Sequence, residues 1–237
     1  MKFQNYKMNI PIYVVNYKNP ERRQRMSHRF SSLGLYCIFT PEVHKTDPRL
    51  KSHRINDLRT ASIMLQHLDS IRHFYENTME DHCIVCEDDI HISKNFVKHL
   101  PEILKTFKTL DLDVLMLGYL LYYKITDSHL HRHYFPLLGN TENYNIHGYP
   151  DDIWGAQMYL ISRKYAKHLL ETYTPLYAVL YEDIPYNPDW IITKKGKRGL
   201  LNPMIAVEEG VNLSDNWGQN DFHKRCFECN YDSSLFV

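Results

Sequence analysis

Short apolar runs alternate with helical patterns along this chain, and this alternation constrains its fold more than any other feature. The first run, Ile10 to Val15, is rich in β-branched residues and predicts a strand. Pro20 then suits the first turn of a helix, which we expect over residues 21–30, and a second strand is expected at 35–39. A strand, a helix and a strand in this order are typical of an α/β domain with a parallel sheet.

The same alternation continues through the rest of the chain. Further strands are predicted at 83–86, 113–117 and 155–161, and helices at 63–74, 94–99, 101–107 and 163–173. Ser93 and Ser162 are the expected N-caps of two of these helices. Residues 122–152 have no clear period and are expected to form loops and short strands over a cleft. No repeat or linker interrupts the sequence, so a single domain is predicted over 1–237.

Charge and cysteine content narrow the class of protein. Lys plus Arg and Asp plus Glu both number 28, so the formal net charge is zero and no broad basic surface is expected to collect nucleic acid. Any nucleotide would therefore be bound by a local site. The apolar run near the N-terminus is too short and too polar for a signal sequence or a membrane span, and the five cysteines suggest reduced thiols. These features predict a cytoplasmic protein without a transmembrane segment.

The segment CIVCEDD, residues 83–89, carries two cysteines followed by three acids. Cys83 and Cys86 form a CxxC pattern, and Cys226 and Cys229 form another, so a four-cysteine zinc site has to be considered. On a strand, however, side chains three positions apart face opposite sides, and most of the chain separates the two pairs. We therefore predict that Cys83 and Cys86 are buried core residues. We favour the same interpretation for the second pair but leave zinc open there.

The three acids at the end of this segment suggest an oxygen-ligand site. In extended chain Glu87 and Asp89 would point to one side and Asp88 to the other. Ligands of open α/β sheets bind at the carboxyl ends of strands, and a divalent cation would offset the repulsion between neighbouring carboxylates. Bound Mg²⁺ or Mn²⁺ could bridge a diphosphate there. The alternative is a solvated acidic turn that leads into the helix after Ser93, and position alone supports both interpretations about equally.

Five stretches of the chain share patterns with one enzyme family, in the same order. They are IYVVN with PERRQRM (12–26), ASIMLQHLDSIRHF (61–74), IVCEDDI (84–90), DVLMLG (113–118) and WGAQMYLISRKYAKHLL (154–170). Together they resemble glycosyltransferase family 25, which includes lipooligosaccharide sugar transferases and procollagen galactosyltransferases. The third stretch is similar to the acidic motif of that family, and the second places His67 at its histidine.

The sequence also departs from the family pattern at several positions. The glycine and glutamate that usually begin the second motif are replaced near 60–62, and its usual serine is Gln66. Tyr165-Ala166 stands where the family has Gly-Ala, and the segment after that helix is longer, running from 182 to 189. These differences bear on donor and acceptor preference more than on the class of reaction.

The resemblance implies a fold and an activity. The expected fold is a GT-A type, Rossmann-like mixed sheet flanked by helices, with a nucleotide-sugar half at about 10–120 and an acceptor half at about 121–237. The expected activity is inverting, metal-dependent transfer of galactose or glucose from a UDP-sugar to an acceptor hydroxyl on a glycan or glycoprotein.

The resemblance, together with position in the chain, also nominates site residues. The expected ligands of Mn²⁺ or Mg²⁺ are Glu87, Asp88 and Asp89, with His223 as a further candidate. The candidate donor-binding residues are Asn16, Arg22, Arg23, His67 and Asp88. The base that deprotonates the acceptor is expected among Asp189, Asp152, Glu182 and Asp183, with Asp189 favoured although a capping role explains it equally well. Trp154 and Tyr159 are candidates to contact the acceptor sugar, with core packing favoured for Tyr159.

Two other functions compete with this one. A nucleotidyltransferase or another nucleotide-sugar enzyme could use the same acids, but it should carry a glycine- and lysine-rich phosphate loop after the first strand, and residues 17–20 contain no glycine. A catalytically silent glycan-binding or scaffold protein could retain the same fold. Glu87, Asp88 and Asp89 argue against that alternative, because without a metal such a cluster has little structural purpose.

Overall fold

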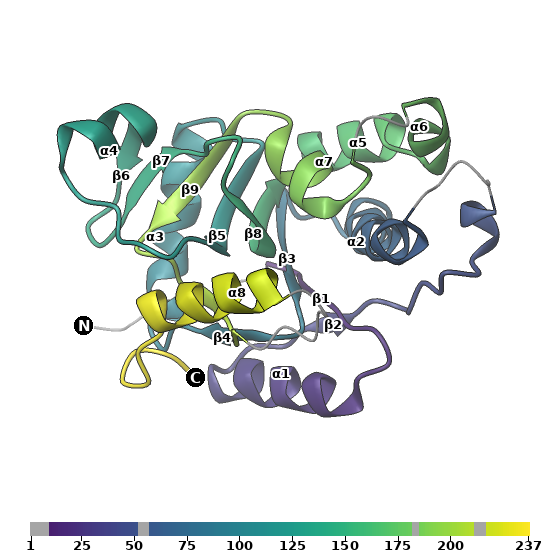
Figure 1. The fold of residues 1–237 in the computed structure, drawn as a ribbon, viewed down its shortest axis with the longest axis horizontal. Coiled ribbons are helices and arrows are strands. Elements are labelled where there is room, and N and C mark those ends of the chain that lie inside the picture. Colours follow the sequence, from purple (N-terminus) through teal and green to yellow (C-terminus); the bar gives the residue numbers. More distant parts are fainter. Residues whose placement is uncertain (1–9, 52–56, 182–184, 211–216) are drawn as a thin grey trace.

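The computed structural model describes residues 10–51, 57–181, 185–210 and 217–237. These residues form a mixed α/β fold in which helices flank an eight-stranded sheet of order β2-β1-β3-β8-β5-β9-β7-β6 (Figure 1). The prediction of a mixed α/β sheet flanked by helices is confirmed. The strands of this sheet are β1 (Ile12–Val15), β2 (Ile38–Phe39), β3 (His82–Glu87), β5 (Val114–Leu120), β6 (Leu137–Asn140), β7 (Asn145–Gly148), β8 (Trp154–Ser162) and β9 (Arg198–Asn202).

A second, two-stranded sheet pairs β4 (Ile90–Ile92) with β10 (Ala206–Glu208). The described helices are α1 (Pro20–Ser32), α2 (Leu58–Asn77), α3 (Phe96–Thr109), α4 (His129–Tyr134), α5 (Arg163–Thr172), α6 (Pro175–Leu180), α7 (Pro188–Lys194) and α8 (Trp217–Asn230), with a 3-10 turn at Pro48–Leu50. No helix among them combines the length and the apolar character needed to cross a membrane.

The direction of each strand decides which strand ends meet at the candidate site. β1 lies parallel to β3, with Val15 opposite Glu87, whereas β8 runs antiparallel to both β3 and β5. The carboxyl ends of β1 and β3 and the start of β8 therefore lie at one edge of the sheet. Asn16, Glu87 and Trp154 are brought to that edge from three distant parts of the sequence.

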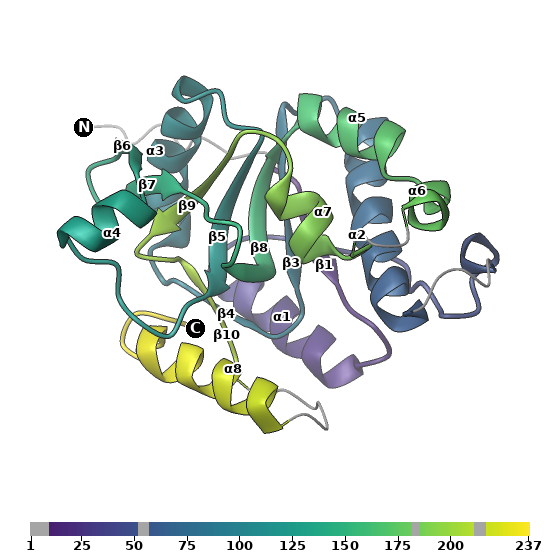
Figure 2. The ribbon, with the colours of Figure 1, turned by 45° about the horizontal axis from the view of Figure 1, so that its top comes forward.

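Two hydrophobic clusters cover the two faces of the large sheet. Residues of α2, α5 and α7 pack on one face, and residues of α1 and α3 pack on the other. Figures 1 and 2 show α2, α5 and α7 grouped on one side of the sheet. Cys83 belongs to the first cluster and Cys86 to the second, so the prediction of two buried strand residues on opposite faces is confirmed.

The segment after the acids differs from the prediction. Asp89 leads into β4 rather than into a helix, and Asn95, not Ser93, precedes a single helix α3 that contains Pro101. Proline removes one backbone hydrogen bond, but α3 buries Phe96, Leu100, Ile103 and Phe107 along one side, and this burial outweighs the loss. The interpretation of the acids as the entry to a helix is therefore wrong.

Residues 122–152 also contain more regular structure than expected. They include α4 and the hairpin of β6 and β7, and β7 extends the main sheet by pairing with β9. Ser162, by contrast, is the N-cap of α5 as predicted, because its hydroxyl accepts a hydrogen bond from the backbone N–H of Tyr165.

Candidate active site

A cleft of about 590 Å³ opens at the carboxyl ends of β1 and β3. Its walls come from the start of α1, the segment after β2, the N-terminal half of α2, β10 and α8. The lining side chains that carry charge are Arg22, Lys45, Arg59, Glu87, Asp88, Asp89, Glu208 and His223. The position agrees with the general rule that ligands of α/β sheets bind beyond the carboxyl ends of the strands.

The acidic motif forms the floor of this cleft. Arg22 Nη1 lies 3.1 Å from Asp88 Oδ1 and 2.9 Å from Asp89 Oδ2. The prediction that Asp88 and Asp89 point to opposite sides is therefore wrong, because the chain leaves the extended conformation after Glu87. Asn16 Nδ2 also donates a hydrogen bond to Asp88, so Asn16 holds an acid of the site in place.

Carboxylates crowd around Glu87. Burial and the negative charges of Asp189, Glu208 and Asp88 raise the pKa of Glu87 to about 8. Its side chain still exposes 33% of its surface, so the neighbouring charges matter alongside burial. The pKa of Asp89 is raised well above its usual range by burial and by Glu87 and Glu208. Burial and mutual repulsion therefore favour the protonated forms of Glu87 and Asp89 in the ligand-free cleft.

Asp89 has an oxygen that this arrangement leaves without a partner. Its Oδ1 is buried, and no group in the described ranges donates a hydrogen bond to it. Within those same ranges no three His, Cys, Asp or Glu side chains are arranged so that they could hold a metal ion. In this arrangement the Arg22 guanidinium, rather than a set of ligands, faces the acids.

His67 and Tyr159 lie behind Glu87 rather than on the wall of the cleft. Both side chains are fully buried, His67 Nδ1 is 2.8 Å from the Tyr159 hydroxyl, and His67 Nε2 is 3.8 Å from Glu87 Oε1. Burial lowers the pKa of His67 to about 4, so its ring is neutral at pH 7. His67 Nε2 has no hydrogen-bond partner in the described part of the chain, and neither residue is exposed to a donor or an acceptor.

Glu208 is a residue of the cleft that the sequence analysis missed. Its carboxylate oxygens lie 2.7 and 2.8 Å from His223 Nδ1, so α8 is tied to β10 at the cleft. Burial lowers the pKa of His223, but the bond to Glu208 outweighs it and the net shift is upward. A signal for Glu208 was present, since the apolar pair Ala206-Val207 leads directly into two acids, as the apolar residues 84–86 lead into three.

The other predicted donor-binding residue, Arg23, is exposed and lies over the Phe39 ring, 4.2 Å from its centroid, outside the cleft lining. Lys45 and Arg59 line the cleft instead. Neither was predicted, because no local pattern distinguishes them from other surface cations.

Of the candidate bases, Asp189 lies beside the acids. It belongs to the first turn of α7, its Oδ1 accepts a hydrogen bond of 2.8 Å from the Gly155 N–H, and its pKa is raised mainly by burial. Asp152 is exposed and accepts a hydrogen bond from the Tyr134 hydroxyl. Glu182 and Asp183 lie outside the described residues. Trp154 is exposed at the start of β8, directly before Gly155.

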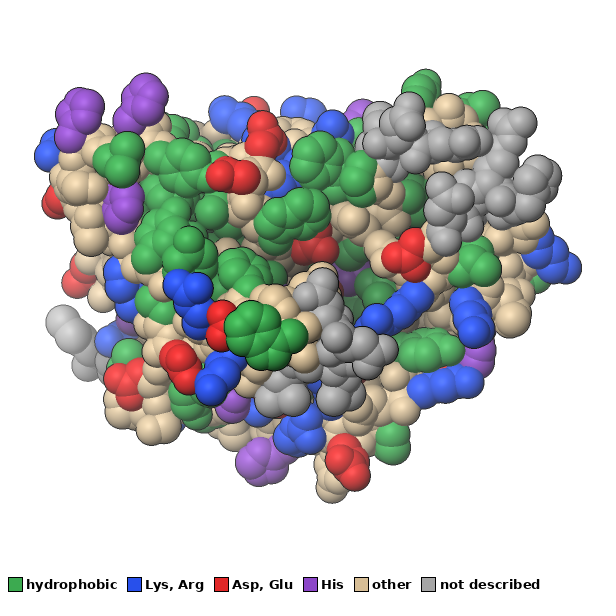
Figure 3. Space-filling view, viewed as in Figure 1, with side chains coloured by type: hydrophobic (Ala, Val, Ile, Leu, Met, Phe, Trp, Pro, Cys, Tyr) green, Lys and Arg blue, Asp and Glu red, His purple; other side chains and the backbone are tan. Residues whose placement is uncertain are grey.

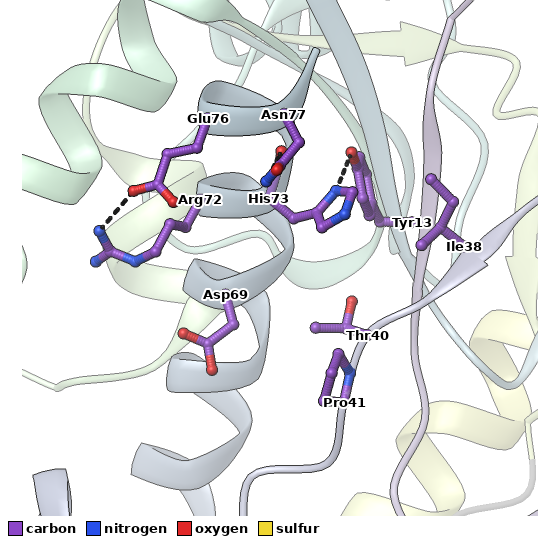
Figure 4. Close-up of a pocket in the computed structure, with 9 residues that line it drawn as sticks. All are labelled: Tyr13, Ile38, Thr40, Pro41, Asp69, Arg72, His73, Glu76 and Asn77. Atoms are coloured by element: carbon purple, nitrogen blue, oxygen red, sulfur yellow. Dashed lines mark hydrogen bonds and ion pairs between the residues drawn. The ribbon is translucent and has the colours of Figure 1, made fainter.

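A second cavity, of about 280 Å³, lies between β2 and α2 (Figure 4). Figure 4 shows the Tyr13 hydroxyl bonded to His73 and Arg72 paired with Glu76 along α2. None of the predicted site residues lines this cavity. The cleft at the acidic motif is therefore the candidate active site.

We expect the ligand-free protein to lose stability relative to a Glu87→Gln variant as the pH rises from about 4.5 to about 8. Folding raises the pKa of the Glu87 carboxyl, so the folded protein keeps this proton at a pH where the unfolded chain has already lost it. The contribution of Glu87 to the stability of the folded state is therefore fully present at low pH. It is lost as the pH rises to the folded pKa of about 8. Urea unfolding across this pH range measures the difference. Glu76→Gln, an exposed change on α2, is the control. Parallel curves for wild type and Glu87→Gln would contradict the expectation.

The cleft can now be compared with known proteins. Residues 70–185 match the model of glycosyltransferase family 25 (LPS biosynthesis protein). No curated protein matches the chain. Among solved structures, "Crystal Structure of A197 from STIV" is similar at a TM-score of 0.47 and 14% sequence identity, over 84% of this chain and 85% of that one. The matched residues include Glu87, Asp88, Asp89 and Trp154, and residues 70–185 thus carry a glycosyltransferase family 25 domain, which supports glycosyltransferase activity for this protein.

Proposed function

We propose that this protein is an inverting, metal-dependent glycosyltransferase that moves galactose or glucose from a UDP-sugar to a hydroxyl group on a glycan or glycoprotein. The observation that carries the proposal is the group of crowded carboxylates, Glu87, Asp89 and Glu208, at the carboxyl edge of the sheet inside a family 25 domain. The cleft also has room for a ligand of nucleotide-sugar size.

The donor side of the cleft combines anionic and cationic groups. Arg22, Lys45 and Arg59 supply positive charge for a diphosphate, while most of the lining comes from the first half of the chain, at about 10–120. Glu208 and His223 come from the second half, 121–237, so the proposed donor site draws on both.

The oxygen atoms of these acids are suitable ligands for Mn²⁺ or Mg²⁺. Both ions prefer carboxylate oxygens, and Asp89 Oδ1 is buried without a hydrogen-bond partner in the described part of the chain. Glu87, Asp88 and Asp89 are the proposed ligands, with His223 as a further candidate once it leaves Glu208. Neutralisation of the departing diphosphate is the chemistry that the cation supplies when bound.

Asp189 is the proposed general base. In an inverting transfer the acceptor hydroxyl oxygen forms a bond to the anomeric carbon while the bond from that carbon to the UDP oxygen breaks, and UDP leaves with those electrons. The hydroxyl proton passes to the carboxylate of Asp189, whose raised pKa makes it a stronger base than an ordinary aspartate. The Gly155 N–H holds one carboxylate oxygen and so fixes the direction of the other.

Nucleotide release distinguishes this function from its rivals. The purified protein is incubated with UDP-glucose or UDP-galactose and MnCl₂, and UDP release and thermal stabilisation are measured, with GDP-mannose as the donor control. We expect UDP to be released and stabilisation by UDP-sugars to require the cation. Release of the sugar 1-phosphate in place of UDP would indicate a nucleotidyltransferase, because uridylyl transfer breaks the diphosphate bond of the UDP-sugar. Binding of glycans with no response to any nucleotide-sugar would indicate a silent glycan-binding protein.

A further inference from the structure

Two tryptophans form an aromatic pair beside Asp189. Trp154, at the start of β8, exposes 40% of its surface, and Trp190, in the first turn of α7, is half-buried. Their ring centroids lie 6.1 Å apart and the ring planes are tilted by 35°. Figure 3 shows hydrophobic side chains gathered around α7 on the same face as acidic side chains. A large aromatic surface kept partly in water beside a catalytic candidate is typical of a ligand contact.

The backbone ties this pair to the proposed base. Trp154 precedes Gly155, Trp190 follows Asp189, and the Gly155 N–H donates to Asp189 Oδ1 over 2.8 Å. Gly155 has a φ of +124°, a backbone conformation that residues with a side chain rarely adopt, so glycine is favoured at this connection. The segments that carry the two indole rings are therefore joined by a hydrogen bond to the Asp189 carboxylate.

Lys194 joins the same segments from the other end of α7. Its side chain is buried, and its Nζ donates a hydrogen bond of 2.8 Å to the Pro150 carbonyl and another to the Ile153 carbonyl. Those carbonyls belong to the chain that leads into Trp154. The segment that leads into Trp154 is thus anchored to α7, the helix that carries Trp190.

We propose that Trp154 and Trp190 form a subsite for a pyranose ring of a carbohydrate acceptor, with the reacting hydroxyl directed at Asp189. This inference rests on the proposed function and deepens it by choosing a glycan over a peptide or lipid hydroxyl. A pyranose presents a face of C–H groups with hydroxyls around its rim, so it matches an aromatic surface whose neighbouring residues in the chain, Gly155 and Asp189, hold a carboxylate. The side chains of a peptide acceptor would not require two indole faces at this place.

Direct binding tests the subsite without relying on transfer. In a Trp217→Phe protein the paired residues are the only tryptophans, because the chain contains three. Titration with methyl β-galactopyranoside, methyl β-glucopyranoside and lactose should change the tryptophan emission of this protein. A serine-containing peptide at equal concentration should not. A response to the peptide alone would overturn the choice of a glycan.

Kinetics tests the same two residues through the acceptor. With UDP-galactose or UDP-glucose as donor and these sugars as acceptors, Trp154→Ala and Trp190→Ala should each raise the acceptor KM about 10-fold or more, while the KM for the UDP-sugar stays near that of wild type. Trp154→Phe should restore most of the loss because a ring face remains. Tyr36→Ala is the control, since Tyr36 is 93% exposed just before β2.

The outcomes separate the two proposals. If wild type uses none of the UDP-sugars but the glycosides still change the tryptophan emission, the proposed reaction is wrong and the subsite stands. If wild type is active and both alanine variants keep the acceptor KM of wild type, the subsite is wrong and the reaction stands.

Discussion

Asp189→Asn is expected to lower kcat by about 10²- to 10⁴-fold, the usual contribution of a positioned general base. An asparagine oxygen can still accept the hydrogen bond from the Gly155 N–H, so the first turn of α7 should keep its place. The amide cannot take the proton of an acceptor hydroxyl. UDP release with acceptor present measures the loss, and thermal stabilisation by UDP-sugar should remain because the donor side of the cleft is untouched.

Asp152→Asn is the matched control for this result. Asp152 is exposed and bonded to Tyr134, and it was an alternative base on the same edge of the sheet. We expect the kcat of this variant to stay within a few-fold of wild type. A large loss in Asp152→Asn together with a small loss in Asp189→Asn would assign the base to Asp152 instead.

The elements around the site could be predicted from sequence because local pattern determines them. Four apolar residues, Cys83 to Cys86, are enough to specify a buried strand, and Ser162 is enough to begin α5. The rule that ligands bind at carboxyl ends of strands then placed Glu87 at the site. The rule that successive side chains point to opposite sides failed at Asp88, because it holds only while the chain remains extended.

Contacts between distant segments could not be predicted in this way. Arg22 lies 66 positions from Asp88, and Gly155 lies 34 positions from Asp189, so no window of sequence contains either pair. Arg22 meets Asp88 because β1 pairs in parallel with β3, and β8, which inserts antiparallel between β3 and β5, brings Gly155 to the same edge of the sheet. The separate strand patterns do not encode this order. The burial of His67 and Tyr159 behind Glu87 follows from the same order.

Asp89→Asn is expected to weaken Mn²⁺-dependent UDP binding by about 30-fold or more, as loss of one partner from a buried charged site costs about 2–5 kcal/mol. The same change should leave the ligand-free protein as stable as wild type, or more stable, at pH 8. The reason is that burial and the charges of Glu87 and Glu208 already disfavour the ionised form of Asp89, while Arg22 keeps its contact with Asp88. Isothermal titration with UDP and MnCl₂ and urea unfolding measure the two effects.

Opposite effects on binding and stability separate a lost ligand group from a damaged fold. Asp81→Asn is the control, because Asp81 is exposed at the other end of β3 and paired only loosely with Lys108, at 3.7 Å. It should change neither quantity. If Asp89→Asn binds UDP as tightly as wild type and with the same dependence on Mn²⁺, the acids do not hold the cation. Positive charge for the diphosphate would then have to come from Arg22, Lys45 and Arg59, which line the same cleft.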